Sequence, residues 1–142
     1  MEVIVHLDTN AYSAFVRGEP NVVFTVERAP ALVLSPIVIG ELKCGFALGS
    51  RAQRNLEQLQ EFQESPRVSV PSIDDVVTSS YARIFKQLRR DGRPIPTNDL
   101  WIAAFLRSGQ EEALLTLDEH FSFIDGLAVI HTKEDFLKFM NR

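Results

Sequence analysis

Short, continuously apolar segments alternate along this chain with longer segments in which apolar residues recur every three or four positions. The short segments predict buried strands and the longer ones predict helices. Strands are predicted at residues 3–7, 31–34, 68–70, 113–117 and 127–130. Because apolar strands separated by helices are typical of a parallel sheet covered on both faces, we expect an α/β fold of this kind.

Capping residues, prolines and glycines mark the ends of the predicted helices. Gly18 ends the first, Pro20 lies in the first turn of the second, and Thr132 with Asp135 resembles a capping box for the last. Ser72 or Asp74 caps the fifth helix, and Thr97 the sixth. The predicted helices cover residues 9–17, 20–28, 35–48, 51–64, from 72 or 74 to 89–92, 98–107 and 133–140.

Glu41 lies in the most apolar of these helices. At 3.6 residues per turn it shares a narrow stripe with Ile37, Cys44 and Leu48, and Lys43 is the only other charged residue of the helix. We therefore expect a helix buried nearly all round, with Cys44 as a small core residue. A buried ionised carboxylate is paired, protonated or bound to metal. No Lys or Arg lies one turn away, so the partner of Glu41 must come from elsewhere in the chain.

Three aspartates lie at the ends of other apolar segments. Asp8 and Asp118 each follow a predicted strand, and Asp99 opens the apolar stretch of the sixth helix. Taken singly, each has an ordinary explanation as a helix cap. However, the carboxyl ends of parallel strands meet at one edge of the sheet, where ligands bind. We expect these aspartates and Glu41 to share one crevice there.

Carboxylates that share a crevice repel one another and require a cation. Oxygen-only ligation favours Mg²⁺ or Mn²⁺, which activate water and clamp phosphate oxygens, so phosphodiester hydrolysis is the predicted reaction class. Zinc is not predicted, because His6, His120 and His131 are scattered and there is a single cysteine. We interpret His6 as a core residue and His120 as a candidate second contributor to the site. The sequence has no glycine-rich phosphate loop or nucleophile elbow.

The bulk composition indicates one soluble globular domain spanning residues 1–142. Apolar residues make up 45% of the sequence, charged residues 24%, and the net charge is −4. Without the four candidate acids, acidic and basic residues balance, so the net charge neither favours nor excludes a nucleic-acid substrate. With one cysteine, no signal peptide and no membrane span, a cytoplasmic location is expected.

A basic cluster precedes Asp99 in the sequence. Arg89, Arg90 and Arg93 form its end, and a solvated helix face is the simpler explanation for them. The alternative is that these side chains contact the phosphates of RNA.

Four motifs, in this order, resemble the PIN-domain ribonucleases, and among them the VapC-type toxins of prokaryotic toxin-antitoxin modules. They are Leu7-Asp8-Thr9-Asn10, Gly40-Glu41-Leu42, Asn98-Asp99-Leu100-Trp101-Ile102-Ala103-Ala104 and Leu115-Thr116-Leu117-Asp118-Glu119-His120-Phe121. The resemblance runs essentially from end to end. His6 is a departure, because an aliphatic or aromatic residue is more common before Leu7-Asp8.

The resemblance implies a PIN-like five-stranded, mainly parallel sheet flanked by helices, and an endoribonuclease that depends on Mg²⁺ or Mn²⁺. It implies that Asp8, Glu41, Asp99 and Asp118 are the catalytic metal ligands. It also implies that Thr9, Asn10 and Thr116 orient those carboxylates or touch the substrate. The implied partners are RNA, a cognate VapB-type antitoxin and a second copy in a homodimer.

Two alternatives stay open at this point. The chain is either an active nuclease or a catalytically silent PIN-fold module that binds RNA or a protein. A phosphotransfer enzyme with Asp8 as nucleophile, as in haloacid-dehalogenase-like phosphatases, is the other enzymatic alternative. Those enzymes use Asp-x-Asp, whereas this chain has Asp8-Thr9-Asn10.

Overall fold

The fold is built on one sheet of five parallel strands. The computed structural model describes residues 2–107 and 109–142. Within these ranges the strand order is β3-β2-β1-β4-β5, and every neighbouring pair is parallel. The strands are β1 (Ile4–Leu7), β2 (Ala31–Val33), β3 (Val68–Ser69), β4 (Glu112–Leu115) and β5 (Val129–Ile130). The predicted α/β fold with five parallel strands is confirmed.

The α-helices follow the predicted order, and a short 3₁₀ helix after β4 was not predicted. The helices are α1 (Thr9–Arg17), α2 (Pro20–Arg28), α3 (Pro36–Ala47), α4 (Ala52–Gln63), α5 (Asp75–Arg90), α6 (Thr97–Ala104), the 3₁₀ helix η1 (Glu119–Phe123) and α7 (Lys133–Met140). Gly18 adopts a left-handed φ of 82° after α1, as its place as a terminator predicts. Asp74 caps α5, and the capping box of Thr132 and Asp135 is present at α7.

The prediction for α6 is wrong at both ends. Thr97 is the first helical residue and not the cap. Pro96 occupies the N-cap position, without a side-chain hydrogen bond. The helix stops at Ala104, whereas its apolar pattern continues to Leu106. Phe105 and Leu106 lie after the end of the helix but are buried. The apolar pattern therefore predicted correctly which residues are buried, but not where the helix ends.

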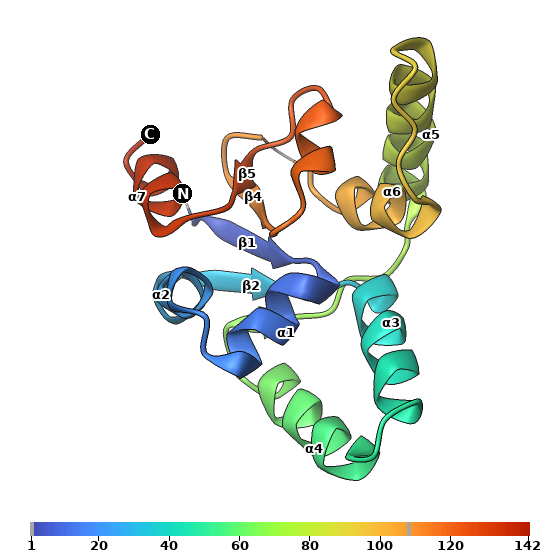
Figure 1. Cartoon of the computed structure of the whole chain (residues 1–142). Coiled ribbons are helices and arrows are strands. Elements are labelled where there is room, and N and C mark those ends of the chain that lie inside the picture. The colour runs from blue at the N-terminus through green and yellow to red at the C-terminus, as the bar shows by residue number, and fades with distance from the viewer. Residues whose placement is uncertain (1, 108) are drawn as a thin grey trace.

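The connections place a ligand crevice between β1 and β4. The chain crosses from β1 through α1 and α2 to β2, and later in the opposite direction from β3 through α5 and α6 to β4 (Figure 1). Because such crossovers are right-handed, the two pairs of helices cover opposite faces of the sheet. The strand order reverses between β1 and β4, which is where α/β folds bind ligands.

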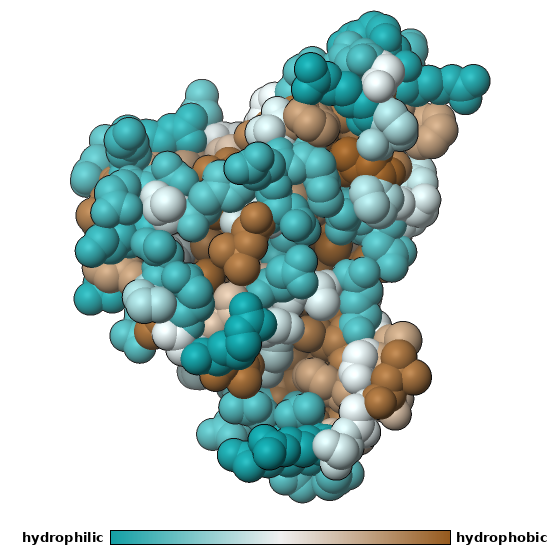
Figure 2. Space-filling model, in the orientation of Figure 1, coloured by the Kyte–Doolittle hydropathy of each residue, from teal (hydrophilic) through white to brown (hydrophobic). Residues whose placement is uncertain are grey.

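Helix α3 corrects the expectation of an all-round buried helix. Only Val38 and Leu42 are buried in it, whereas Cys44 is exposed and Leu48, at its end, is 86% exposed. Figure 2 shows brown apolar surface on the outer side of this region, at the lower right of the molecule. The prediction that Cys44 is a core residue is therefore wrong.

His6 is a core residue, as predicted. It is 4% exposed, and its Nε2 lies 2.7 Å from Oε1 of the buried Glu112 on β4. The other oxygen of Glu112 accepts from the backbone N–H of Arg107 at 3.1 Å.

Among the described residues, no helix has the length and apolar character needed to cross a membrane.

Candidate active site

One open pocket of about 460 Å³ contains all four predicted acids. It lies at the carboxyl ends of β1 and β4, where α1, α3 and α6 meet. Its lining residues are Asp8, Thr9, Asn10, Glu41, Pro96, Thr97, Asn98, Asp99 and Asp118. Segments that are far apart in the sequence therefore place their carboxylates around a single space, as the strand-end argument predicts.

Asp8 is the most deeply buried of the four acids. It follows β1, caps α1 and is 3% exposed. Its Oδ1 accepts from the N–H of Ala11 at 2.7 Å, and its Oδ2 accepts from the hydroxyl of Thr116. Burial raises the pKa of Asp8 to about 6, although the bonds from Thr116 and Ala11 oppose that rise. A carboxylate in this position gains from a nearby cation.

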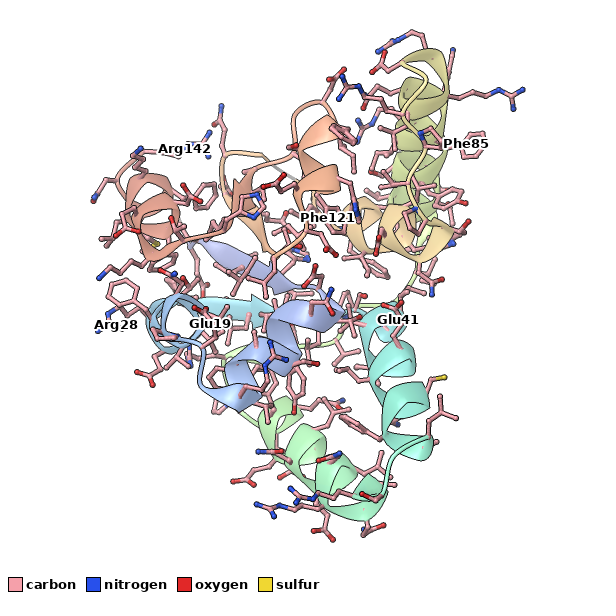
Figure 3. All side chains as sticks on the ribbon, in the orientation of Figure 1. Glu19, Arg28, Glu41, Phe85, Phe121 and Arg142 are labelled. Carbon is pink, nitrogen blue, oxygen red and sulfur yellow. The ribbon has the colours of Figure 1, made fainter. Side chains whose placement is uncertain are left out.

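Glu41 is half-buried and turns from α3 toward α1 and α6. Its Oε1 accepts from the hydroxyl of Thr9 at 2.5 Å, and its Oε2 accepts from Nδ2 of Asn98 at 3.2 Å. Figure 3 places Glu41 in the upper part of α3, beside the start of α1. The sequence predicted that the partner of Glu41 comes from elsewhere in the chain. Two neutral donors, from Thr9 and Asn98, fill that role, and no Lys or Arg pairs with Glu41 in the described structure.

Asp99 lies in the first turn of α6 and faces η1. Its Oδ2 lies 2.8 Å from Nε2 of His120. Burial raises the pKa of Asp99, and the carboxylates of Glu41 and Asp118 add to the rise, whereas His120 acts against it. His120 thus lies within hydrogen-bond reach of a site carboxylate, as the sequence allowed.

Asp118 completes the set from the loop after β4. Its Oδ2 accepts from Nδ2 of Asn10 at 3.4 Å, and its N–H donates to Oγ1 of Thr116 at 3.0 Å. The carbonyl oxygen of Thr116 lies 2.9 Å from Nδ1 of His131. Thr116 therefore links Asp8 to Asp118, and Thr9, Asn10 and Thr116 each bond to an acid or to its backbone.

Asn98 is a site residue that sequence reasoning did not single out. It bonds to Glu41 across 57 positions of the chain. The sequence could have indicated Asn98 through its position directly before Asp99. Both residues lie in the first turn of α6, and this turn lines the pocket.

The basic side chains of the α5 end do not line this pocket. Arg90 pairs with Asp91 at 3.2 Å and with Asp125 at 3.6 Å, and the guanidinium of Arg93 lies 4.6 Å from the ring centroid of Phe123. The carboxyl end of α5 projects away from the sheet (Figure 1).

The donor set of the pocket fits a hard divalent cation. Its potential ligands are carboxylate oxygens, with hydroxyl and amide groups around them, and no sulfur or imidazole nitrogen lines it. In the described ranges, no group of three or more Asp, Glu, His or Cys side chains is arranged so that it could hold a metal ion as the chain stands. Mg²⁺ binds through a few carboxylates and keeps several waters, so an open arrangement suits it.

An acid-lined pocket at the reversal point of a parallel sheet defines an α/β protein with a candidate divalent-cation site. A sequence model of the PIN domain matches residues 5–127, which is most of the chain. This chain belongs to the PIN domain family.

Individual relatives agree with that assignment. The chain is 29% identical over 97 residues to Ribonuclease VapC4 of Mycobacterium tuberculosis, a match that covers 68% of this chain and 74% of that protein. VapBC-1 from nontypeable Haemophilus influenzae superposes with a TM-score of 0.74 at 27% identity, over 90% of this chain and 97% of the other. VapBC2 from Rickettsia felis, bound to promoter DNA, gives a TM-score of 0.77 at 23% identity over 90% and 98%. The last likeness is one of fold.

Proposed function

We propose that this protein is a VapC-type toxin, a metal-dependent endoribonuclease that hydrolyses RNA phosphodiester bonds and is inhibited by a cognate VapB-type antitoxin. The observation that carries the proposal is the single pocket lined by Asp8, Glu41, Asp99 and Asp118. Membership of the PIN domain family and similarity to a curated ribonuclease support it. The likeness to VapBC assemblies supports the antitoxin partner, and we propose a homodimer in addition.

The four acids are the proposed ligands and the proposed catalytic residues. A bound Mg²⁺ or Mn²⁺ would lower the pKa of a coordinated water and neutralise charge on the phosphate. Burial raises the pKa values of Asp8 and Asp99, and the positive charge of a bound cation would favour the ionised forms of these carboxylates. Thr9, Asn98 and Thr116 hold the carboxylates in place, and Asn10 fixes Asp118 beside the mouth of the pocket.

RNA reaches the pocket from its open side. Arg89, Arg90 and Arg93 remain proposed RNA contacts, at a distance from the reacting phosphate because they lie on and after the projecting end of α5. Replacing all three by Gln is expected to flatten the dependence of RNA affinity on salt concentration. An unchanged slope would remove these side chains from the interface.

Cleavage of cellular RNA by the purified protein tests the proposal directly. We expect cleavage with Mg²⁺ or Mn²⁺, none with a chelator, and none from Asp8→Ala or Asp99→Asn. Asp75→Asn is the matched control, since Asp75 is an exposed acid in the first turn of α5 outside the pocket. Metal-dependent cleavage that persists in both site variants would refute the assignment.

The alternatives are separated by the same measurements. RNA or antitoxin binding with no cleavage under any metal would favour the silent binding module. That alternative is supported by the finding that, in the described ranges, no three Asp, Glu, His or Cys side chains are arranged to hold a metal ion. The phosphotransfer alternative fits poorly, because the enzymes of that class use Asp-x-Asp and this chain has Asn10 in place of the second aspartate. Trapping of a phosphorylated Asp8 would revive it.

A further inference from the structure

A second pocket lies between the carboxyl end of α5 and the loop, residues 91–96, that leads to α6. Gly92 has a left-handed φ of 66°, which lets the chain reverse there. The loop then runs back along α5 (Figure 1), and the N–H of Arg93 donates to the carbonyl of Leu88 at 2.9 Å. This pocket, which we call the α5 pocket, has a volume of about 300 Å³. It is lined by Phe85, Leu88, Arg89, Gly92, Pro94, Ile95 and Leu100.

The α5 pocket combines an apolar lining with one cationic side chain. The ring of Phe85 is 46% exposed, and Figure 3 shows it projecting from α5. Leu88 and Leu100 are buried and form the inner part of the lining. None of the described residues that line the pocket is acidic, and Arg89 is its only charged residue. Such a lining fits a small ligand that is flat and apolar in one part and anionic in another.

Arg89 differs from the other arginines of this region. Arg90 pairs with Asp91 at 3.2 Å, and the guanidinium of Arg93 lies 4.6 Å from the ring centroid of Phe123. Arg89 is exposed and forms no ion pair with any Asp or Glu in the part of the chain that the structure describes. Its charge is therefore available to an anionic ligand.

One short segment of the chain joins the α5 pocket to the acidic pocket. Pro94 and Ile95 line the α5 pocket, residues 96–99 line the acidic pocket, and Leu100 lines the α5 pocket again. The two spaces are thus neighbours on either side of the start of α6. A polymer that places one phosphate among the four acids can extend past this segment into the α5 pocket.

We infer that the α5 pocket binds an unpaired nucleobase of the RNA substrate, stacked on the ring of Phe85, with the adjoining phosphate held by Arg89. Phe85 and Arg89 are four residues apart on α5, so they lie on the same side of the helix. The inference rests on the proposed nuclease function and adds a substrate class, which is RNA that is single-stranded beside the cleaved bond. Bases in loops and at ends can turn out of the stack onto aromatic rings and guanidinium planes, whereas bases inside a duplex cannot.

An acidic peptide with apolar side chains is the competing occupant, because it offers the same combination of charge and apolar surface. Two observations favour RNA. Phe85 and Arg89 present planar groups, onto which any base can stack. The neighbouring pocket holds four carboxylates, which repel an acidic peptide that extends past the start of α6. The phosphate of RNA can approach the same carboxylates when a divalent cation lies between them.

Fluorescence anisotropy of a labelled RNA tests the pocket without cleavage. The probe is a single-stranded RNA of about twelve nucleotides, measured in a chelator. We expect Phe85→Ala to raise the dissociation constant about tenfold, and Phe85→Tyr, which keeps the ring, to bind nearly as the wild type does. Val76→Ala is the matched control, since Val76 is 50% exposed on the same helix and lies outside the pocket. Equal affinity of Phe85→Ala and the wild type would overturn the inference.

Two further probes separate stacking from charge. A ribose-phosphate chain of the same length without bases should bind Phe85→Ala and the wild type equally, and so should a duplex of the same sequence. Arg89→Gln should weaken binding of the probes with and without bases, and Arg90→Gln should do so less, because Arg90 is engaged by Asp91. A loss in Phe85→Ala that is the same with and without bases would show that no base enters the pocket.

A peptide of alternating Glu and Phe tests the competing occupant. We expect it to bind the wild type and Phe85→Ala with the same affinity. If Phe85→Ala weakened binding of the peptide and left binding of single-stranded RNA unchanged, the α5 pocket would be a site for a protein segment and the inference would fall.

The affinity for Mn²⁺ and the cleavage of RNA keep this inference apart from the nuclease itself. Phe85→Ala should bind Mn²⁺ as the wild type does, since Phe85 does not line the acidic pocket, and a parallel loss of Mn²⁺ affinity would contradict a role confined to the base. A protein that binds single-stranded RNA through Phe85 but cuts none with Mg²⁺ would refute the nuclease alone. A protein that cuts RNA equally well, at the same positions and with the same affinity, after Phe85→Ala would refute the base pocket alone.

Discussion

The hydroxyl of Thr116 donates a hydrogen bond to Oδ2 of Asp8 across the gap between β4 and β1. Thr116 is fully buried and Asp8 nearly so, and the same hydroxyl oxygen accepts from the N–H of Asp118. One side chain thus ties together two of the four carboxylates. This bond opposes the rise in the pKa of Asp8 that burial causes.

Thr116→Val removes the hydroxyl at nearly constant volume. We expect the free energy of unfolding to fall by about 1–3 kcal/mol near pH 7.5, because a buried acceptor loses its partner. The pKa of Asp8 should rise further. Thr25→Val is the matched control, since the buried Thr25 donates to the carbonyl of Asn21 at 3.1 Å and touches no acid. Urea denaturation at two pH values measures the free energy of unfolding of both variants. The loss caused by Thr116→Val should depend on pH, whereas the loss caused by Thr25→Val should not.

Asp8→Asn is expected to stabilise the metal-free protein at neutral pH. The folded pKa of Asp8 is raised from 3.8 to about 6, so the protonated form favours folding. The contribution of protonated Asp8 to the free energy of unfolding is fully present below the unfolded pKa of 3.8 and is lost as the pH rises through about 6. The full change is at most about 3 kcal/mol. In chelator, the variant should therefore exceed the wild type near pH 7.5 and match it near pH 4. An advantage that did not change with pH would show that burial of the charge is not its cause.

Millimolar Mg²⁺ should raise the melting temperature of the wild type near pH 7.5. At ten times the dissociation constant the stabilisation is about 1.4 kcal/mol, or a few degrees. Glu41→Gln should abolish the shift, whereas Glu27→Gln, at an exposed position on α2, should preserve it. A melting temperature indifferent to Mg²⁺ would contradict the proposed cation site.

The buried pair of His6 and Glu112 predicts strong coupling between two strands. His6→Ala leaves the Glu112 carboxylate buried without its 2.7 Å partner, at an expected cost of about 3–5 kcal/mol. Replacing both residues by Leu should recover part of that loss, because the imidazole and carboxylate are removed together, whereas the N–H of Arg107 still loses its acceptor. A double-mutant cycle measures the coupling, and additive effects of the single changes would argue against it.

Sequence reasoning located most of the fold and the acids of the site for identifiable physical reasons. Apolar runs mark the strands, and Gly18 and the Thr132 capping box mark helix ends, because these signals are local. The prediction that α3 is buried all round failed for a different reason. The apolar side chains of Cys44 and Leu48 indicate a surface that is unfavourable in water, but they do not indicate whether another part of the same chain covers that surface. Contacts such as that of Asn98 with Glu41 join distant segments, so only the fold reveals them.

His120 is not one of the four acids, but it is expected to influence metal binding through its contact with Asp99. Its Nε2 lies 2.8 Å from Oδ2 of Asp99, which leaves Oδ1 without a bond to this imidazole, and its ring lies 4.8 Å from that of Phe121. Removing it by His120→Ala should raise the pKa of Asp99, because His120 favours the ionised form, and should free the carboxylate to rotate. We expect Mn²⁺ affinity, measured by calorimetry or electron paramagnetic resonance, to fall about 10–100-fold, as it does when groups that orient metal ligands are lost. His131→Ala is the control, since His131 lies beside the backbone oxygen of Thr116 and contacts no acid of the pocket. Equal Mn²⁺ affinity in wild type and His120→Ala would show that Asp99 is held by its helix alone.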